Sequence, residues 1–271
     1  MTPPRPATSG RPAMSRAARG RGLSGAGLSP RGPASDARKA AAARTRLRGM
    51  ADPGDAAVLR RFFKTGPGEY GEGDRFLGVR VPAVRKLARE FEHMPRREIV
   101  RLLRSRFHEE RLLALLIMVR RFERGDEAQQ KWIYGLYLEN TRQVNNWDLV
   151  DLTAAHIVGA YLKEKPTQPL HDLARSELLW ERRIAIVATF YFIRRSDFGP
   201  TLTVAGLLLS DTEDLIHKAA GWMLREVGKR DMAAEEEFLR RHCREMPRTM
   251  LRYAIEKFPE RKRLKYLNGS V

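Results

Sequence analysis

Several features common in other classes of protein are scarce or missing in this sequence. A single cysteine, Cys243, excludes an intramolecular disulfide and fits a reducing cytoplasm. The longest apolar runs fall well short of the roughly 18–20 residues that a membrane-spanning helix needs, so we expect no membrane partner. The six histidines lack the paired spacing of a metal site, and we therefore expect neither a metal ion nor another cofactor.

Acidic residues are also in short supply. Asp and Glu number 33 against 51 Lys and Arg, which gives a formal net charge of +18 at pH 7. Such an excess favours a polyanionic partner, with nucleic acid ahead of an anionic membrane surface. Eleven basic side chains and one acid, Asp36, lie in residues 1–50, so this segment carries +10 and the remaining chain +8. The main part of the chain is therefore basic in its own right.

Large apolar residues are almost absent from residues 1–50, which consist mainly of Pro, Gly, Ala, Ser and Arg. Such a segment buries too little surface to offset its ordering entropy, so we expect a disordered basic N-terminal extension over 1–50. It is interpreted as a phosphate-contacting arm, as an Arg-rich transit peptide, or as translation from a start codon upstream of the real one at Met14 or Met50. The composition suits a GC-rich coding region and favours the last interpretation. A secretory signal is not expected because no apolar core segment is present.

Period-two alternation is missing as well, so we expect essentially no β-sheet. Instead, five helical stretches begin on similar phrases at steps of 36, 36, 35 and 34 residues, with Arg111, Trp147, Arg183, Lys218 and Arg252 at equivalent positions. A constant interval of this size predicts stacked helix pairs, because one pair alone cannot bury its apolar face. We therefore predict, for residues 51–271, an all-α, superhelical solenoid of HEAT/ARM-like helical repeats.

The equivalent positions of successive repeats line one face of a solenoid, and here that face carries unusual residues. Trp147 and Asp151 are four residues apart and share one helical face. Arg183 begins the next inner helix, and Trp222 lies one turn into the following one. Taken alone, Trp222 is compatible with core packing, Trp132 and Trp180 are interpreted as packing residues, and Asp148 as an acid that complements the helix N-terminus. Taken together, the inner-face residues Trp147, Asp151, Arg183 and Trp222 predict a functional site on the inner face.

Four phrases carry a family resemblance: FLGVRVPAVRKLA (76–88), NNWDLVDL (145–152), WERRIAI (180–186) and IHKAAGWMLREVGKRD (216–231). Through them the chain resembles, over about residues 53–267, the AlkD-type DNA alkylation repair family of HEAT-like repeat alkylpurine DNA glycosylases. The resemblance implies that Trp147, Asp151 and Trp222 are the active-site residues and that Arg183 contacts DNA. It also implies one departure, because Phe62 stands where the family has an active-site tyrosine on its first helix, which keeps the ring and loses the hydroxyl.

The chemistry expected of such a site needs one carboxylate. Alkylation at N3 or N7 puts a positive charge on a purine, so the base leaves as a neutral molecule and needs no general acid. Breaking the C1′–N bond develops oxocarbenium charge on the deoxyribose, which the carboxylate of Asp151 would stabilise while it orients water. Two unit charges 4 Å apart at an effective dielectric near 20 interact by roughly 4 kcal/mol, or about a thousandfold in rate. Trp147 and Trp222 would flank the sugar with rings that favour a cationic lesion.

The expected partner is double-stranded DNA that contains 3-methyladenine or 7-methylguanine, held without base flipping as the resemblance implies. Inner-face basic residues would follow its phosphates, and with Phe62 they form the predicted DNA-binding set: Arg111, Arg183, Lys218, Arg248 and Arg252. We expect a monomer in a bacterial cytoplasm, associated with the nucleoid through DNA. Two alternatives remain: a non-catalytic nucleic-acid-binding scaffold, and a protein-interaction scaffold whose groove binds an acidic peptide.

Overall fold

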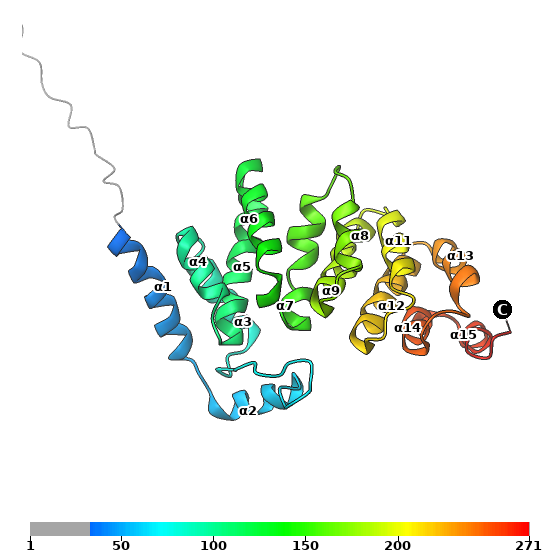
Figure 1. Ribbon diagram of the computed structural model, residues 1–271, viewed down its shortest axis with the longest axis horizontal. Helices are drawn as coiled ribbons and strands as arrows, with labels where there is room; N and C mark the ends of the chain where they lie inside the picture. Colours follow the sequence, from blue (N-terminus) through cyan, green and yellow to red (C-terminus); the bar gives the residue numbers. More distant parts are fainter. Residues whose placement is uncertain (1–32, 271) are drawn as a thin grey trace, which may run out of the picture. The chain divides into compact units, whose positions relative to one another are not determined.

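The computed structural model describes residues 33–270, in which helices follow one another in pairs, as Figure 1 shows. One helix of most pairs lies on the inner face: α3 (Val81–Glu90), α5 (His108–Arg124), α7 (Trp147–Asp151), α9 (Leu179–Ala188), α12 (Asp214–Gly228) and α14 (Arg248–Ala254). The other helices of the row are α4 (Arg96–Leu103), α6 (Glu127–Glu139), α8 (Gln168–Ala174), α11 (Gly199–Leu207), α13 (Met232–His242) and α15 (Glu260–Leu267). Among the described residues there is no strand, only an isolated bridge between Arg75 and Phe107. The predicted all-α solenoid is confirmed.

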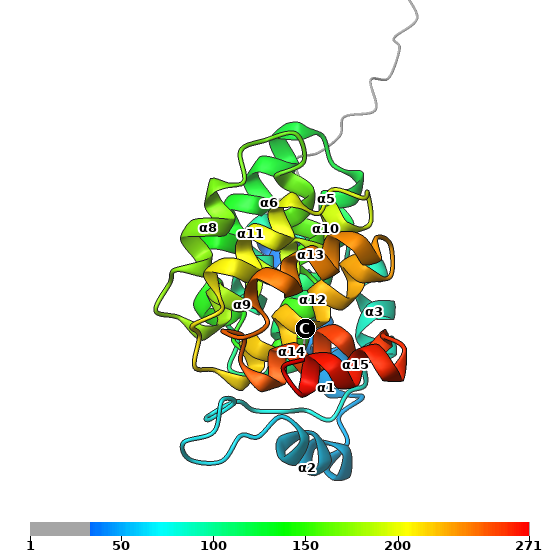
Figure 2. The ribbon, with the colours of Figure 1, turned by 90° about the vertical axis from the view of Figure 1, so that its right-hand side faces the viewer.

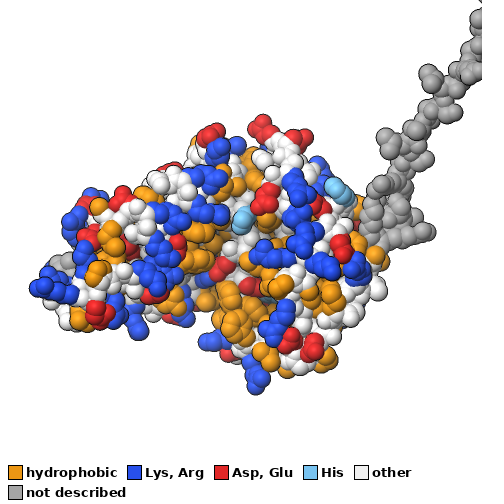
Figure 3. Space-filling view, turned by 180° about the vertical axis from the view of Figure 1, so that it is seen from behind, with side chains coloured by type: hydrophobic (Ala, Val, Ile, Leu, Met, Phe, Trp, Pro, Cys, Tyr) orange, Lys and Arg blue, Asp and Glu red, His pale blue; other side chains and the backbone are white. Residues whose placement is uncertain are grey.

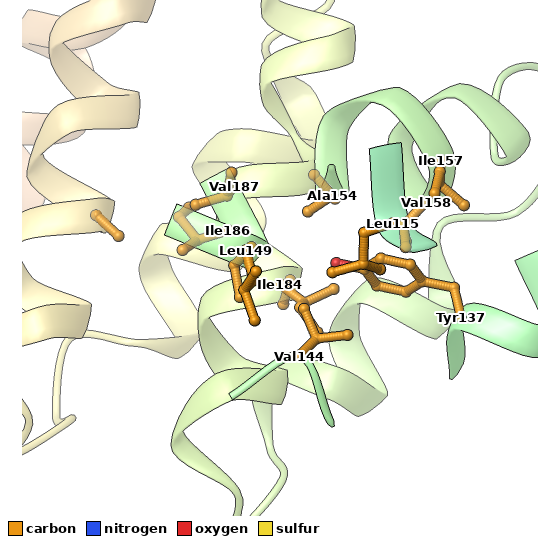
Figure 4. Close-up of a cluster of buried hydrophobic side chains, with 14 of the residues drawn as sticks. Leu115, Tyr137, Val144, Leu149, Ala154, Ile157, Val158, Ile184, Ile186 and Val187 are labelled. Carbon is orange, nitrogen blue, oxygen red and sulfur yellow. The ribbon is translucent and has the colours of Figure 1, made fainter. Parts of the chain in front are cut away.

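The apolar core runs continuously through the helix pairs, and Figure 4 shows its central part. Leu115, Leu149 and Ile184, from three successive inner helices, are fully buried. Tyr137 is also fully buried, and its hydroxyl lies 3.0 Å from the hydroxyl of Thr153. Each pair therefore covers the apolar face of the next, which is the physical reason for the repeat. None of the described helices combines the length and apolar character needed to cross a membrane.

Two glycines let neighbouring inner helices approach closely. A Cβ atom on Gly221 of α12 would lie 2.4 Å from the carbonyl oxygen of Met250 in α14. A Cβ atom on Gly159 would lie 2.2 Å from the carbonyl oxygen of Ala188 at the end of α9. Both distances are far shorter than any real contact, so larger residues would push the repeats apart.

The inner helix that begins with α7 is irregular. Regular α-helix ends at Asp151, and a π-helical turn, η2 (Ala155–Gly159), follows after a short break. In the break, the hydroxyl of Thr153 donates to the carbonyl oxygen of Leu149 at 2.5 Å. Single π turns of this kind are often found beside functional sites. The remaining short segments are α10 (Phe190–Ile193), which extends α9, and the 3₁₀ turns η1 (Thr141–Gln143) and η3 (Ile255–Lys257).

Helix α1 (Pro33–Arg48) corrects the predicted boundary of the folded domain. Disorder was expected through residue 50, but Ala40, Ala43 and Leu47 are buried in the core. Their spacing of three and four residues makes an alanine-rich stripe that packs closely without large side chains, so a search for large apolar residues misses it. Arg44 and Arg48 are tied to the next repeat by ion pairs of 3.1 and 2.8 Å to a buried carboxylate on α5. The part of the predicted extension that precedes α1, 1–32, lies outside the described residues.

Helix α2 (Pro53–Phe62) and the loop after it lie across the ends of the helices around α5, as both views show (Figures 1 and 2). The carboxylate of Glu109 holds this loop by accepting hydrogen bonds from the backbone amides of Leu77, Gly78 and Val79 at 2.9, 2.8 and 3.1 Å. Gly78 has φ +85°, and a Cβ there would lie 2.0 Å from a backbone oxygen, so only glycine fits. The first turn of α5 thereby fixes a loop that belongs to the site.

Candidate active site

A hollow of about 850 Å³ on the inner face brings several predicted site residues together. Trp147 enters it from α7, Arg183 from α9, and Lys218 and Trp222 from α12. Phe62, at the end of α2, lies at its rim with 60% of its surface exposed. We call it the tryptophan hollow, defined by Trp147, Arg183, Lys218 and Trp222. Asp151 borders it through its contact with Arg183.

The carboxylate of Asp151 is paired with the guanidinium of Arg183 in a two-pronged contact. Nε and Nη2 of Arg183 donate to Oδ1 and Oδ2 of Asp151 at 3.0 and 2.8 Å. A third bond, from Nη1 to the carbonyl oxygen of Leu215, measures 2.6 Å. Burial raises the pKa of Asp151 above its ordinary value; Arg183 opposes this rise, and the carboxylate of Asp148 adds to it. The site therefore holds a carboxylate of raised proton affinity, oriented by one arginine.

Asp151 is also accessible from other directions. Its side chain is 18% exposed and lines two further hollows. One, of about 350 Å³, is walled by aromatic and aliphatic side chains that include Phe63 and Phe76. The other, of about 220 Å³, is lined by Arg85 and Arg89. The carboxylate is thus held on one side by Arg183 and reachable on the other.

Tyr70 is a site residue that was not predicted from the sequence. Its hydroxyl accepts a hydrogen bond from Nε1 of Trp147 at 3.2 Å and donates to the carbonyl oxygen of Phe62 at 3.4 Å. Burial raises its pKa, although the hydrogen bond from Trp147 acts in the opposite direction. The loop after α2 thus brings a tyrosine hydroxyl to Trp147, next to Phe62. The signal available in the sequence was the lone tyrosine of the glycine-rich stretch GPGEYGEG.

The two tryptophans have different surroundings. Trp147 lies against Phe62 and Phe63, with ring centroids 5.7 and 5.1 Å away. Trp222 is half-buried and has Phe190 at 6.1 Å. Lys218, one turn earlier on α12, is 41% exposed and forms an ion pair of 2.7 Å with Asp214. Aromatic faces and charged side chains of both signs therefore line the tryptophan hollow. Besides Lys218 they include Lys64 and Arg225, and the acids Glu69, Glu213 and Asp214.

Other predicted DNA-binding residues lie elsewhere. The side chain of Arg111 is 5% exposed and donates to the carbonyl oxygens of Gln143 and Ser105 and to Asp74. The loop after α2 covers this first turn of α5, so Arg111 serves the interior and does not face the tryptophan hollow. Arg248 and Arg252 are exposed on α14 and do not line the hollow either, and Arg248 donates to the carbonyl oxygen of Leu267 at 2.9 Å. Within 33–270 no group of three or more His, Cys, Asp or Glu residues is placed to bind a metal ion.

Comparison with known proteins identifies the family to which this chain belongs. Residues 43–258, which include every residue of the tryptophan hollow, match the family described as DNA alkylation repair enzyme. The fold is similar to that of a solved structure, the predicted DNA alkylation repair enzyme from Enterococcus faecalis, with a TM-score of 0.60 and 16% identity over 78% of this chain and 98% of that one. No curated protein sequence matches the chain significantly. The family match covers most of the chain, and the protein therefore belongs to the DNA alkylation repair enzymes.

Proposed function

We propose that the protein is a DNA glycosylase that hydrolyses the N-glycosidic bond of cationic N3- and N7-alkylated purines in duplex DNA. Family membership supports a role in DNA repair. The observation that carries the glycosylase proposal is the Asp151–Arg183 pair, a largely buried carboxylate that is oriented by an arginine and borders a hollow walled by two tryptophans. A carboxylate weakens a surface whose only task is to bind phosphates, whereas it stabilises the positive charge that develops on the sugar.

The reaction divides into bond breaking and water addition. As the C1′–N bond breaks, its electron pair goes to the cationic purine, which leaves neutral, and positive charge develops on the deoxyribose. The carboxylate of Asp151 stabilises this charge, at roughly 4 kcal/mol for a 4 Å separation at an effective dielectric of 20. Water then adds to C1′ and its proton passes through Asp151 to solvent. Arg183 keeps the carboxylate ionised and fixes its direction.

The tryptophans and basic residues have a binding role in this proposal. The faces of Trp147 and Trp222 flank the sugar and the cationic lesion. Lys218 and the exposed arginines of the inner face follow the phosphates, and Figure 3 shows Lys and Arg side chains gathered around a hollowed, partly apolar region of one face. The lesion stays in the duplex, because Asp151 acts on the sugar from the groove.

The proposal is tested by product analysis on methylated duplex DNA. We expect release of free 3-methyladenine and 7-methylguanine well above the spontaneous rate, without added metal. A neutral lesion such as O6-methylguanine, in the same duplex, is the matched control and should not be released, because its base is a poor leaving group. If no base is released above the spontaneous rate and DNA binding is tight and salt-dependent, the glycosylase proposal is contradicted and a damage-binding scaffold is favoured.

A further inference from the structure

His108 is a buried histidine that links two separate parts of the site. It is the first residue of α5, and its side chain is 2% exposed. Its Nδ1 lies 2.9 Å from Oδ2 of Asp74, and its Nε2 lies 2.9 Å from Oδ2 of Asp148. The ring stacks on Phe76 at 4.5 Å and lies 5.3 Å from Phe63. Both ring nitrogens are therefore engaged, and two phenylalanine rings that stack on each other at 5.1 Å pack against the imidazole.

The two carboxylates come from the two elements that supply the site. Asp74 lies in the loop after α2, four residues beyond Tyr70. Asp148 lies in the first turn of α7, directly after Trp147 and three residues before Asp151. Oδ1 of Asp148 also accepts the backbone amide of Leu149 at 2.8 Å, as expected for an acid at a helix N-terminus. One imidazole thus joins the tyrosine loop to the turn that carries Trp147 and Asp151.

The charges around the ring favour an imidazolium. Burial alone would lower the pKa of His108, but the carboxylates of Asp148 and Asp74 outweigh it and raise the pKa to about 9. The other charged group in this network is Arg111 of α5, whose Nη2 donates to Asp74 at 2.8 Å. Two anions and two cations then balance. This network lies next to the proposed catalyst, because the negative charge of Asp148 contributes to the raised pKa of Asp151.

We propose that His108 is a positioning residue of the excision reaction, which fixes the first turn of α7 against the tyrosine loop and so sets Trp147 and Asp151. The inference rests on the proposed glycosylase activity but concerns a residue outside the tryptophan hollow. Glutamine at position 108 is neutral and cannot donate to both carboxylates at once. The turn would then lose its link to the loop, while Lys218 and Trp222 on α12 would remain in place.

The kinetic test compares wild type with His108→Gln in single-turnover excision at saturating protein. We expect the excision rate to fall roughly tenfold to a hundredfold, as for other small misplacements of catalytic groups, with DNA affinity within about twofold of wild type. The wild-type rate should also decline above about pH 9, and the variant should lack this decline. An unchanged rate and pH profile would overturn the proposal.

Glu109→Gln is the matched control. Glu109 is also buried in the first turn of α5 and holds the same loop, but its bonds go to loop amides and not to α7. Its replacement should leave the decline above pH 9 in place. Amide hydrogen exchange without DNA separates this proposal from the activity: His108→Gln should accelerate exchange in residues 147–152, and Glu109→Gln only in residues 74–80. Equal protection of 147–152 in wild type and His108→Gln would contradict the positioning role, even if no base is released by any protein.

Nitrogen NMR of the wild-type histidine keeps the inference testable if His108→Gln fails to fold. Protons on both Nδ1 and Nε2 of His108 at pH 7 are the expected result. A ring with one protonated nitrogen at pH 7 would overturn the proposed bridge between two carboxylates.

Discussion

The guanidinium of Arg183 holds the carboxylate of Asp151 by two hydrogen bonds of 3.0 and 2.8 Å, across the gap between α7 and α9. Arg183 was expected to contact a DNA phosphate, yet its side chain is only 6% exposed. Its main contacts are Asp151 and the carbonyl oxygen of Leu215. Arg183 therefore orients the proposed catalyst. The carboxylate comes from one repeat and the arginine that orients it comes from the next.

Replacement of Arg183 by glutamine should move the acid limb of the excision profile to higher pH. The carboxylate of Asp151 must be ionised to act, and its pKa is already raised by burial against the opposing effect of Arg183. Without the guanidinium the pKa of Asp151 rises further. On acidification the variant therefore loses activity at a higher pH than wild type does. Single-turnover rates between pH 5 and 8, corrected for spontaneous release, measure the limb. A limb at the wild-type position would show that Arg183 does not control the ionisation of Asp151.

Replacement of Tyr70 by phenylalanine should lower the excision rate about threefold to tenfold, the value of one net hydrogen bond. The variant keeps the ring and removes the hydroxyl that accepts from Nε1 of Trp147. Phe62→Leu is the comparison, because it removes the exposed ring at the rim and leaves that hydrogen bond in place. A wild-type rate in Tyr70→Phe would show that the hydroxyl does not hold Trp147.

A chain that begins at Met50 should be less stable than the full chain by roughly 3 kcal/mol or more, the cost of leaving a buried charge without its partners. The carboxylate of Glu110 is 1% exposed, and both its arginine partners, Arg44 and Arg48, belong to α1. Urea unfolding of the two chains gives the comparison. The double variant Arg44→Ala and Arg48→Ala, which keeps the buried stripe of α1, should fall between them. Equal midpoints would mean that α1 contributes nothing to the fold.

Replacement of Glu235 by glutamine should stabilise the protein increasingly as the pH rises from about 5 to about 8. Burial raises the pKa of Glu235 to about 8, and its Oε1 makes no hydrogen bond with the described residues. A carboxyl group whose pKa is higher in the folded than in the unfolded state destabilises the fold once the pH exceeds the unfolded-state pKa. The loss of stability reaches its full size once the pH exceeds the folded-state pKa. The gain at pH 8 should be on the order of 2–4 kcal/mol, and close to zero at pH 4.5. A gain in stability that does not depend on pH would contradict the raised pKa of Glu235.

The sequence predicted the solenoid because the interval of about 35 residues is a direct consequence of stacking helix pairs. It also predicted that Trp147, Arg183 and Trp222 face one hollow, since equivalent repeat positions share a face. The same reasoning failed for Arg111, which has the right repeat position but lies beneath the loop after α2. Repeat phase describes an ideal row of helices and contains no information about segments that cover it.

Three further features depend on contacts between distant residues. Tyr70 and Trp147 are 77 residues apart, and a glycine-rich loop gives no periodicity from which their contact could be predicted. Helix α1 is stabilised by alanines and by the buried carboxylate of Glu110, so neither its composition nor its charge distinguishes it from a disordered arm. The role of His108 likewise depends on two aspartates, 34 and 40 residues away, that only the folded chain brings to its ring.

The excision rate of Asp151→Asn measures whether the carboxylate of Asp151 catalyses base release. Asparagine keeps the shape and removes the charge, so we predict a single-turnover rate lower by about a thousandfold, with tight binding to methylated duplex DNA retained. A wild-type rate in Asp151→Asn would contradict catalysis by Asp151, because the developing sugar cation would then be stabilised by some other group.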